Sequence, residues 1–165
     1  MVDCLADPDR YTFSSLMSLL IENESKLKEL YERTGKEVSQ ERLKSLLADS
    51  SKNSAKRMNL MQRARVERVV EMTLEPITGL KLADLITTIN QTIQDGNLSN
   101  LEKAMRLELA VSELYARASP RIMQTSSDTG ELLLELSRES VERRHELEWY
   151  VGSAGGISGS EHEDS

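Results

Sequence analysis

The first apolar side chains lie at steps of three and four residues, which is the spacing of one face of an α-helix. Asp7-Pro8 offers a side-chain cap followed by a proline suited to a first turn, and Gly35 favours a helix end. The pattern therefore predicts a helix over about residues 10–33. Its apolar stripe consists of Phe13, Leu16, Leu20, Leu27 and Tyr31.

Two further helices are predicted before the middle of the chain. Ser39 can cap a long helix that reaches about Leu74, ahead of the helix-breaking Pro76 and Gly79. A shorter amphipathic helix follows and ends at the turn sequence Asp95-Gly96-Asn97. The apolar stripe of the shorter helix consists of Leu82, Leu85, Ile86, Ile89 and Ile93.

The second half of the chain predicts another pair of helices. Ser99-Asn100-Leu101-Glu102 is a capping-box pattern, which starts a helix ending near Ala118, before Pro120. Asp128 with Glu131 then starts a last helix that ends near residue 151.

These elements predict an all-α domain over residues 1–151. Two up-down helix hairpins, joined by a long connection that contains a short extra helix, are typical of a four-helix bundle with one crossover. Residues 152–165 are rich in Gly and Ser and then acidic. We therefore expect them to form a disordered tail.

Composition and charge narrow the function. The 165 residues are 38% hydrophobic but only 4% aromatic, which suits helices packed through aliphatic side chains. A net charge of −7 predicts no nucleic-acid partner, because phosphate binding needs a basic surface. No apolar run approaches the ~20 residues of a membrane-spanning helix. With no signal-peptide pattern and a single cysteine, Cys4, we expect a cytoplasmic protein without membrane association or an internal disulfide.

One pattern occurs in each predicted hairpin. Residues 24–33 and residues 108–117 both read E-x4-E-L-Y-x-R. Its equivalent place in the two hairpins favours an internal duplication. Chance similarity stays open, since Glu and Leu are common in helices.

The repeat places one carboxylate of each half on a buried stripe. Glu24 lies between Leu20 and Leu27, and Glu108 lies one helical turn before Val111. A buried carboxylate is costly, so it must bind a metal ion, pair with a cation or take up a proton. The alternative is that a rotation of the helix exposes the carboxylate to water.

The pattern resembles the rubrerythrin-like branch of the ferritin-like superfamily, over about residues 11–150. In that family the first helix of each pair carries an inward Glu seven residues before an aromatic residue, which Glu24 with Tyr31 and Glu108 with Tyr115 match here. The resemblance implies a ferritin-like fold. It also implies a di-iron centre, completed by an E-x-x-H motif on the second helix of each pair.

The first half departs from the family pattern. Ser51 and Ser54 stand where the resemblance places the Glu and His of the first E-x-x-H motif. Neutral hydroxyl groups are poor ligands for iron, manganese or zinc. This half of the site is therefore predicted to have lost its ligands.

The last helix allows two interpretations. Glu142 and His145 form an E-x-x-H sequence on one helix face, and with Glu24 and Glu108 they are the possible metal ligands. A second register, which aligns Leu46-Leu47 with Leu132-Leu133, removes the motif from both halves and leaves His145 structural or exposed. The serines that this register matches are Ser51 with Ser137 and Ser54 with Ser140.

Arginines offer a way to neutralise the buried carboxylates without metal. Arg57 and either Arg143 or Arg144 occur at similar places in the second helix of each pair. Each can form a charge-assisted, bidentate bond with Glu24 or Glu108.

The sequence therefore leads to two functional hypotheses. The first is a non-enzymatic bundle without a cofactor that has lost its di-metal centre and acts as an interaction or assembly module. The second is a residual iron or manganese oxidoreductase of rubrerythrin type. The expected contact is a homo-oligomer or a protein partner on the surface of the second helix. A third interpretation, independent of the family, takes the chain as a helical adaptor whose long second helix binds a partner. It expects an exposed apolar stripe on this helix, consisting of Met61, Val66, Val69, Val70 and Leu74.

Overall fold

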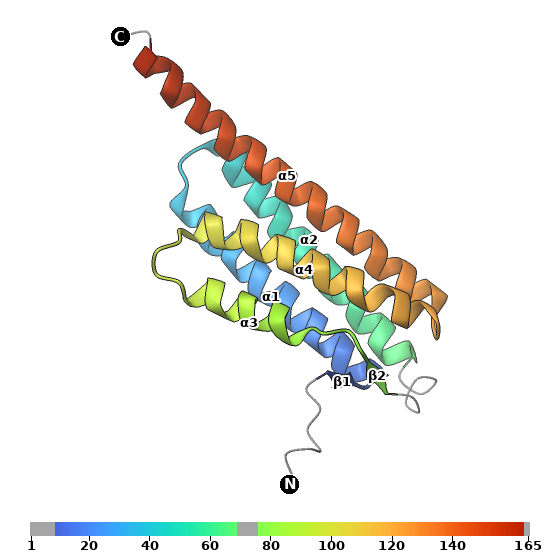
Figure 1. Ribbon diagram of the computed structural model, residues 1–165. Helices are drawn as coiled ribbons and strands as arrows, with labels where there is room; N and C mark the ends of the chain where they lie inside the picture. The colour runs from blue at the N-terminus through green and yellow to red at the C-terminus, as the bar shows by residue number, and fades with distance from the viewer. Residues whose placement is uncertain (1–8, 69–75, 164–165) are drawn as a thin grey trace.

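The computed structural model describes residues 9–68 and 76–163, with side chains through residue 152 except that of Arg68. These residues form five helices and two very short strands (Figure 1). The predicted all-α class is therefore confirmed. The elements in chain order are β1 (Arg10–Tyr11), α1 (Phe13–Glu37), α2 (Glu41–Arg68), β2 (Ile77–Thr78), α3 (Ala83–Gln94), α4 (Asn100–Met123) and α5 (Ser127–Glu163).

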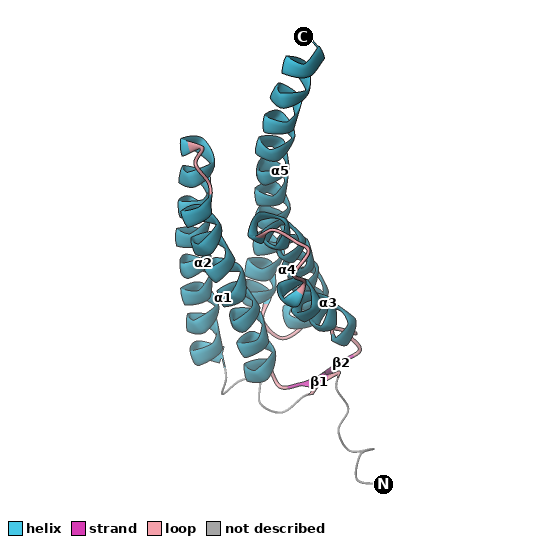
Figure 2. Ribbon diagram, turned by 90° about the vertical axis from the view of Figure 1, so that its left-hand side faces the viewer, coloured by secondary structure: helices cyan, strands magenta, loops and turns pink. Residues whose placement is uncertain are grey.

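The long helices form two hairpins that meet through their first helices. α1 packs along α2, α4 packs along α5, and α1 also packs against α4. α3 lies in the connection between the hairpins and packs on α4 (Figure 1). α2 and α5 contact each other much less than each contacts its own hairpin partner, and Figure 2 shows their ribbons diverging.

The start of α1 differs from the prediction. Its N-cap is Thr12, whose hydroxyl accepts from the Ser15 backbone N–H at 2.9 Å while the Ser15 hydroxyl accepts from the Thr12 N–H. This reciprocal capping satisfies two helix-end donors. The predicted cap at Asp7-Pro8 lies outside the described residues. α1 also continues through Gly35, because a helical glycine is tolerated where packing against α2 holds the turn.

The ends of α4 show how packing overrides a breaker. The capping box of Ser99 and Glu102 is present as predicted, with both reciprocal bonds at 3.1 Å. The predicted end before Pro120 is wrong, since α4 runs on to Met123. Proline removes one backbone donor, but the fully buried Ile122 anchors the last turn in the core.

The backbone of α5 is helical as far as Glu163 (Figure 1). The helix therefore continues beyond the end that was predicted near residue 151. Extending an existing helix needs no new nucleus, so a long, packed helix can propagate through residues of low helix propensity.

The predicted apolar stripe on the second helix is only partly present. Met61 is fully buried, because it continues the core-facing series of α2, and the prediction that it is exposed is wrong. Val66 is 63% exposed. Val69, Val70 and Leu74 lie outside the described residues. In the described part of the chain, none of the helices has the length and apolar character needed to cross a membrane.

A two-residue ladder, which the sequence did not predict, joins the chain before α1 to the connection before α3. β1 and β2 pair antiparallel, with Arg10 opposite Thr78 and Tyr11 opposite Ile77. The Lys81 N–H donates to Asp9 Oδ1 at 2.8 Å next to this ladder. The ladder thus fixes where the crossover begins on its way to α3.

Gly130, in the first turn of α5, lies so close to the end of α4 that a side chain there would clash. A Cβ atom on Gly130 would lie 2.6 Å from Met123 Cα and 2.7 Å from its backbone N. Because backbone cannot yield as a side-chain end can, we expect Gly130→Ala to lower the free energy of unfolding by about 1–3 kcal/mol in urea titrations. Gly96→Ala is the matched control, since its Cβ would meet nothing within 4 Å. Equal stability of the two variants would contradict this close approach.

Candidate functional site

The two repeated glutamates lie at the centre of the core. Glu24 on α1 and Glu108 on α4 are both 0% exposed. Each lies on the apolar stripe of its helix, so its carboxylate is held away from water by neighbouring aliphatic side chains. Neither has been rotated to the surface, and each needs partners inside the protein.

Each carboxylate is hydrogen-bonded by the tyrosine of the other half. The Tyr115 hydroxyl donates to Glu24 Oε1 at 2.6 Å, and the Tyr31 hydroxyl donates to Glu108 Oε1 at 2.7 Å. α1 and α4 run antiparallel, because Glu24 meets Tyr115 while Tyr31 meets Glu108. The repeat with its Glu-to-Tyr step of seven residues therefore forms two reciprocal bonds across the interface of the hairpins.

An arginine from the second helix of each hairpin completes the charge balance. Arg57 Nη1 on α2 lies 3.2 Å from Glu24 Oε1, and Arg143 Nη1 on α5 lies 3.0 Å from Glu108 Oε1. The two arginine side chains are only 4% and 5% exposed. The Arg143 guanidinium also lies over the ring of Tyr31, 5.2 Å from its centroid, in a cation–π contact.

Two serines connect the halves of this network. Ser54 Oγ donates to Glu24 Oε2 at 2.8 Å and accepts from Arg143 Nη1 at 3.2 Å. Ser140 Oγ accepts from Arg57 Nη1 at 3.0 Å. Each arginine thus pairs with the glutamate of its own hairpin and donates to the serine of the other. We call these eight residues the charge network: Glu24, Tyr31, Ser54, Arg57, Glu108, Tyr115, Ser140 and Arg143.

The network also shows which register relates α2 to α5. Ser54 and Ser140 are both fully buried and occupy equivalent places, as do Arg57 and Arg143. This is the register in which Leu46-Leu47 aligns with Leu132-Leu133.

Two residues that the sequence singled out lie elsewhere. Ser51 faces away from the buried carboxylates and bonds to Glu32 Oε1 at 3.2 Å, because it lies on the flank of α2 next to α1. Of the two arginine candidates on the last helix, Arg144 pairs instead with Glu148 at 2.9 Å, near the surface.

Glu142 and His145 do not join the buried glutamates. His145 is 70% exposed in its side chain, with Nδ1 3.7 Å from Glu148 Oε2. Glu142 is exposed on α5, whereas Glu108 has no exposed surface. Within the described ranges, no three His, Cys, Asp or Glu side chains are gathered in a way that would hold a metal ion.

The two carboxylates differ in how completely they are satisfied. Both oxygens of Glu24 accept hydrogen bonds, whereas Glu108 Oε2 has no hydrogen-bond partner among the described residues. Burial raises the pKa of Glu108 to about 7; the charge of Arg143 opposes the rise and that of Glu24 adds to it. Burial, reinforced by the adjacent carboxylates, also raises the pKa of Tyr31 and Tyr115 well above the ordinary value, so both hydroxyls stay protonated as donors.

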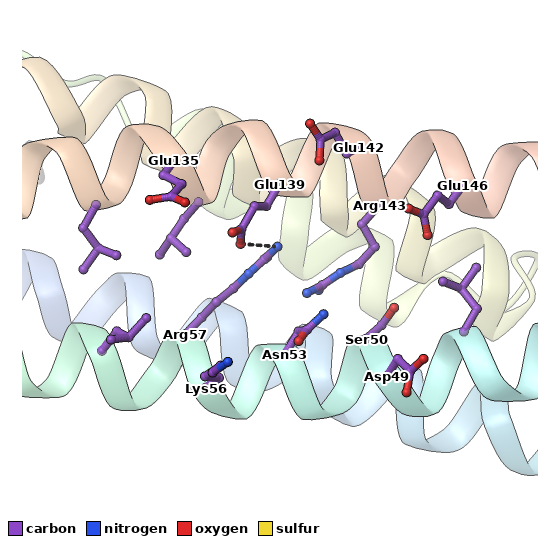
Figure 3. Close-up of a pocket in the computed structure, with 14 residues that line it drawn as sticks. Asp49, Ser50, Asn53, Lys56, Arg57, Glu135, Glu139, Glu142, Arg143 and Glu146 are labelled. Atoms are coloured by element: carbon purple, nitrogen blue, oxygen red, sulfur yellow. Dashed lines mark ion pairs between the residues drawn. The ribbon is translucent and has the colours of Figure 1, made fainter.

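A groove lies above the network, between α2 and α5 (Figure 3). Its volume is about 550 Å³. Arg57 extends from α2 toward α5 and Arg143 extends from α5 toward α2, so the two guanidinium groups form the floor. Arg57 Nη2 also contacts Glu139 Oε2 on the groove wall at 3.4 Å. The two arginines of the charge network therefore lie at the bottom of a groove that is open to solvent.

No family model, curated protein or solved structure matches the chain.

The sequence reasoning missed the role of the tyrosines and of Ser140. The sequence marks Tyr31 and Tyr115 as the aromatic residues of the repeat. Because Glu and Tyr are seven residues apart on each of two antiparallel helices, each hydroxyl lies opposite the carboxylate of the other helix. That step was a usable signal for a hydrogen bond. Nothing in the sequence marked Ser140 apart from its match with Ser54 in one of the two registers.

The ion pair of Glu24 can be tested by a change that keeps its shape. Glu24→Gln removes the only buried counter-charge of the Arg57 guanidinium among the described residues and leaves it the half-exposed Glu139, so we expect a loss of about 3–5 kcal/mol in the free energy of unfolding. Glu29→Gln, which breaks a surface pair with Arg33 whose side chains are 56% and 61% exposed, should cost about 0.5 kcal/mol or less. Thermal and urea unfolding measure both. A Glu24→Gln variant as stable as its control would show that the buried pair contributes nothing.

The raised pKa of Glu108 predicts a pH dependence of stability. Between its ordinary value of 4.5 and the folded value of about 7, the native state binds more protons than the unfolded state. Stability from this group is therefore complete below about pH 4.5 and is lost as the pH rises through 7, by roughly 3 kcal/mol at most. Glu108→Gln should abolish that slope between about pH 5 and pH 8, whereas Glu131→Gln should keep it. Parallel slopes for wild type and Glu108→Gln would contradict the assignment.

Proposed function

We propose that this protein is a ferritin-like four-helix bundle that has lost its di-metal centre and serves as a protein-interaction or assembly module. The observation that carries the proposal is that both buried carboxylates already contact a guanidinium, Arg57 at Glu24 and Arg143 at Glu108. Positive charge is thus supplied by the chain itself at the centre of the bundle.

The arrangement of the helices supports the ferritin-like part of the proposal. Two hairpins, α1–α2 and α4–α5, are joined by a connection that contains α3. The contacts of Glu24 with Tyr115 and of Tyr31 with Glu108 give a pseudo-two-fold relation between the hairpins. Bundles of this class are built from two hairpins with one long crossover, and they place a glutamate of each first helix at the centre.

The chemistry of the network supports the loss of metal. A di-metal site of this class needs carboxylate and imidazole ligands that face one another. Here the second helices supply two guanidinium groups and two hydroxyls, and the guanidinium groups repel a divalent cation. The carboxylate oxygens of Glu24 already accept hydrogen bonds from Tyr115, Arg57 and Ser54, which leaves little capacity to bind a metal ion.

The surface supports a role in protein contact. Large apolar side chains remain in water along the long helices, and Trp149 is the largest of them at 62% exposed. It packs edge-to-face on Tyr150 with ring centroids 5.0 Å apart, which forms a small aromatic surface on α5. Exposed aromatic and aliphatic groups of this kind are typical anchors of protein interfaces. The other exposed large apolar side chains are Leu60, Val66, Leu109, Val141 and Val151.

Metal content tests this proposal directly. After anaerobic reconstitution with iron, manganese or zinc, we expect mass spectrometry to find no stoichiometric metal in the wild-type protein, because arginines already neutralise the carboxylates. His145→Ala serves as the control. Stoichiometric metal in the wild-type protein would overturn the proposal, and its loss in His145→Ala would favour a residual metal-dependent oxidoreductase.

A further inference from the structure

The groove between α2 and α5 has no third helix over it in the described part of the chain. On the opposite side, α3 lies along α4 and reaches α1 through the bond of Lys26 to Asn90, at 3.3 Å. No described helix takes the corresponding place on the α2–α5 side. The groove therefore offers room for one additional helix.

The walls of the groove carry an excess of negative charge. Glu135, Glu139 and Glu146 lie along the side of α5 that faces the groove, and Glu142 lies on its outer edge (Figure 3). α2 adds Asp49. The cations of the groove are Lys56 on the rim and the two arginines of the floor, which are already engaged with Glu24, Glu139 and Glu108.

Three of these acidic side chains have no ion-pair partner among the described residues. Glu135, Glu142 and Glu146 form no ion pair with any other described residue. Glu135 and Glu139 are four residues apart, as are Glu142 and Glu146, and like charges at this spacing destabilise a helix. A cationic surface placed against these side chains would offset the repulsion between them. The spacing of the carboxylates therefore favours a basic partner.

Apolar side chains lie at both ends of the groove. α2 and α5 are antiparallel, because Arg57 meets Glu139 and Ser54 meets Arg143. This direction places Leu60 near Leu132 and Leu136 at one end and leaves Leu46 at the other. An occupant thus meets leucines at its ends, acidic groups along its flank and a polar floor at its centre.

We propose that the groove binds an amphipathic helix of a protein partner, with leucine-type residues on one face and lysine or arginine along its edge. The inference rests on the proposed role as an interaction module and names the chemistry of the partner. The lining spans residues 46–60 of α2 and 132–146 of α5. Fifteen helical residues measure roughly 22 Å, so an occupant of about four turns matches the length of the groove. Helix-in-groove recognition has this form.

A second copy of the chain is the less favourable occupant. A two-fold contact through this groove would place the same acidic wall opposite itself. The chain also carries a net charge of −7, which opposes the approach of another copy. Charge complementarity therefore favours a basic helix from a different protein.

The test uses the full chain and two labelled peptides of about four helical turns, one built from Leu and Lys and one from Leu and Glu. Fluorescence anisotropy at low salt should show binding of the Leu/Lys peptide alone. Glu135→Gln with Glu146→Gln should weaken it about tenfold, because two rim charges are lost. Glu22→Gln with Glu131→Gln, which makes the same charge change outside the groove, should leave the affinity unchanged. Leu60→Gln should weaken binding without changing the charge.

Several outcomes would overturn the inference. They are equal affinity for the two peptides, equal effects of the two double variants, and a dimer in sedimentation that Leu60→Gln dissociates, since the groove would then hold a second copy. Metal content is measured on the same samples. Stoichiometric metal would refute the proposed function whatever the peptides do, whereas absent peptide binding in metal-free protein refutes the groove assignment alone.

Discussion

The structure depends on two buried carboxylates, each of which is contacted by side chains from both hairpins. Glu24 and Glu108 are placed where the core excludes water, and each would be strongly destabilising without the arginine of its own hairpin. The arginines in turn are fixed by serines from the opposite hairpin, Ser54 and Ser140. A set of charges that is costly one by one becomes tolerable because its members are held in a single geometry.

That geometry explains why the core can be so poor in aromatic residues. The two buried tyrosines span the interface between α1 and α4, and their rings supply apolar volume while their hydroxyls reach the carboxylates. Aliphatic side chains complete the layers above and below. The helices are therefore positioned at their centre by directional bonds and elsewhere by packing, which is the division expected where polar groups lie within a helical core.

Much of this could be predicted from the sequence, for reasons that particular residues make clear. Helical periodicity places Glu24 and Glu108 among leucines, and a buried carboxylate requires a cation, which the sequence offers as Arg57 and as either Arg143 or Arg144. The short-range signals also gave the Ser99 cap. Contacts between distant segments decided what the sequence left open or predicted wrongly. They set the register of α5, carried α4 through Pro120 against the prediction, and paired β1 with β2. Periodicity alone describes one helix and carries no information about its neighbour.

The crossed bonds of the tyrosines bear on how the molecule opens. If the α4–α5 hairpin separates from α1–α2, Glu24 loses the Tyr115 hydroxyl, Glu108 loses that of Tyr31, and both arginines lose a serine acceptor. Each hairpin keeps its own ion pair but loses the hydrogen bonds that the other hairpin supplied, so partial opening leaves buried polar groups without partners. We therefore expect the two halves to unfold as one cooperative unit, with the most slowly exchanging amide hydrogens in the middle turns of α1 and α4 together.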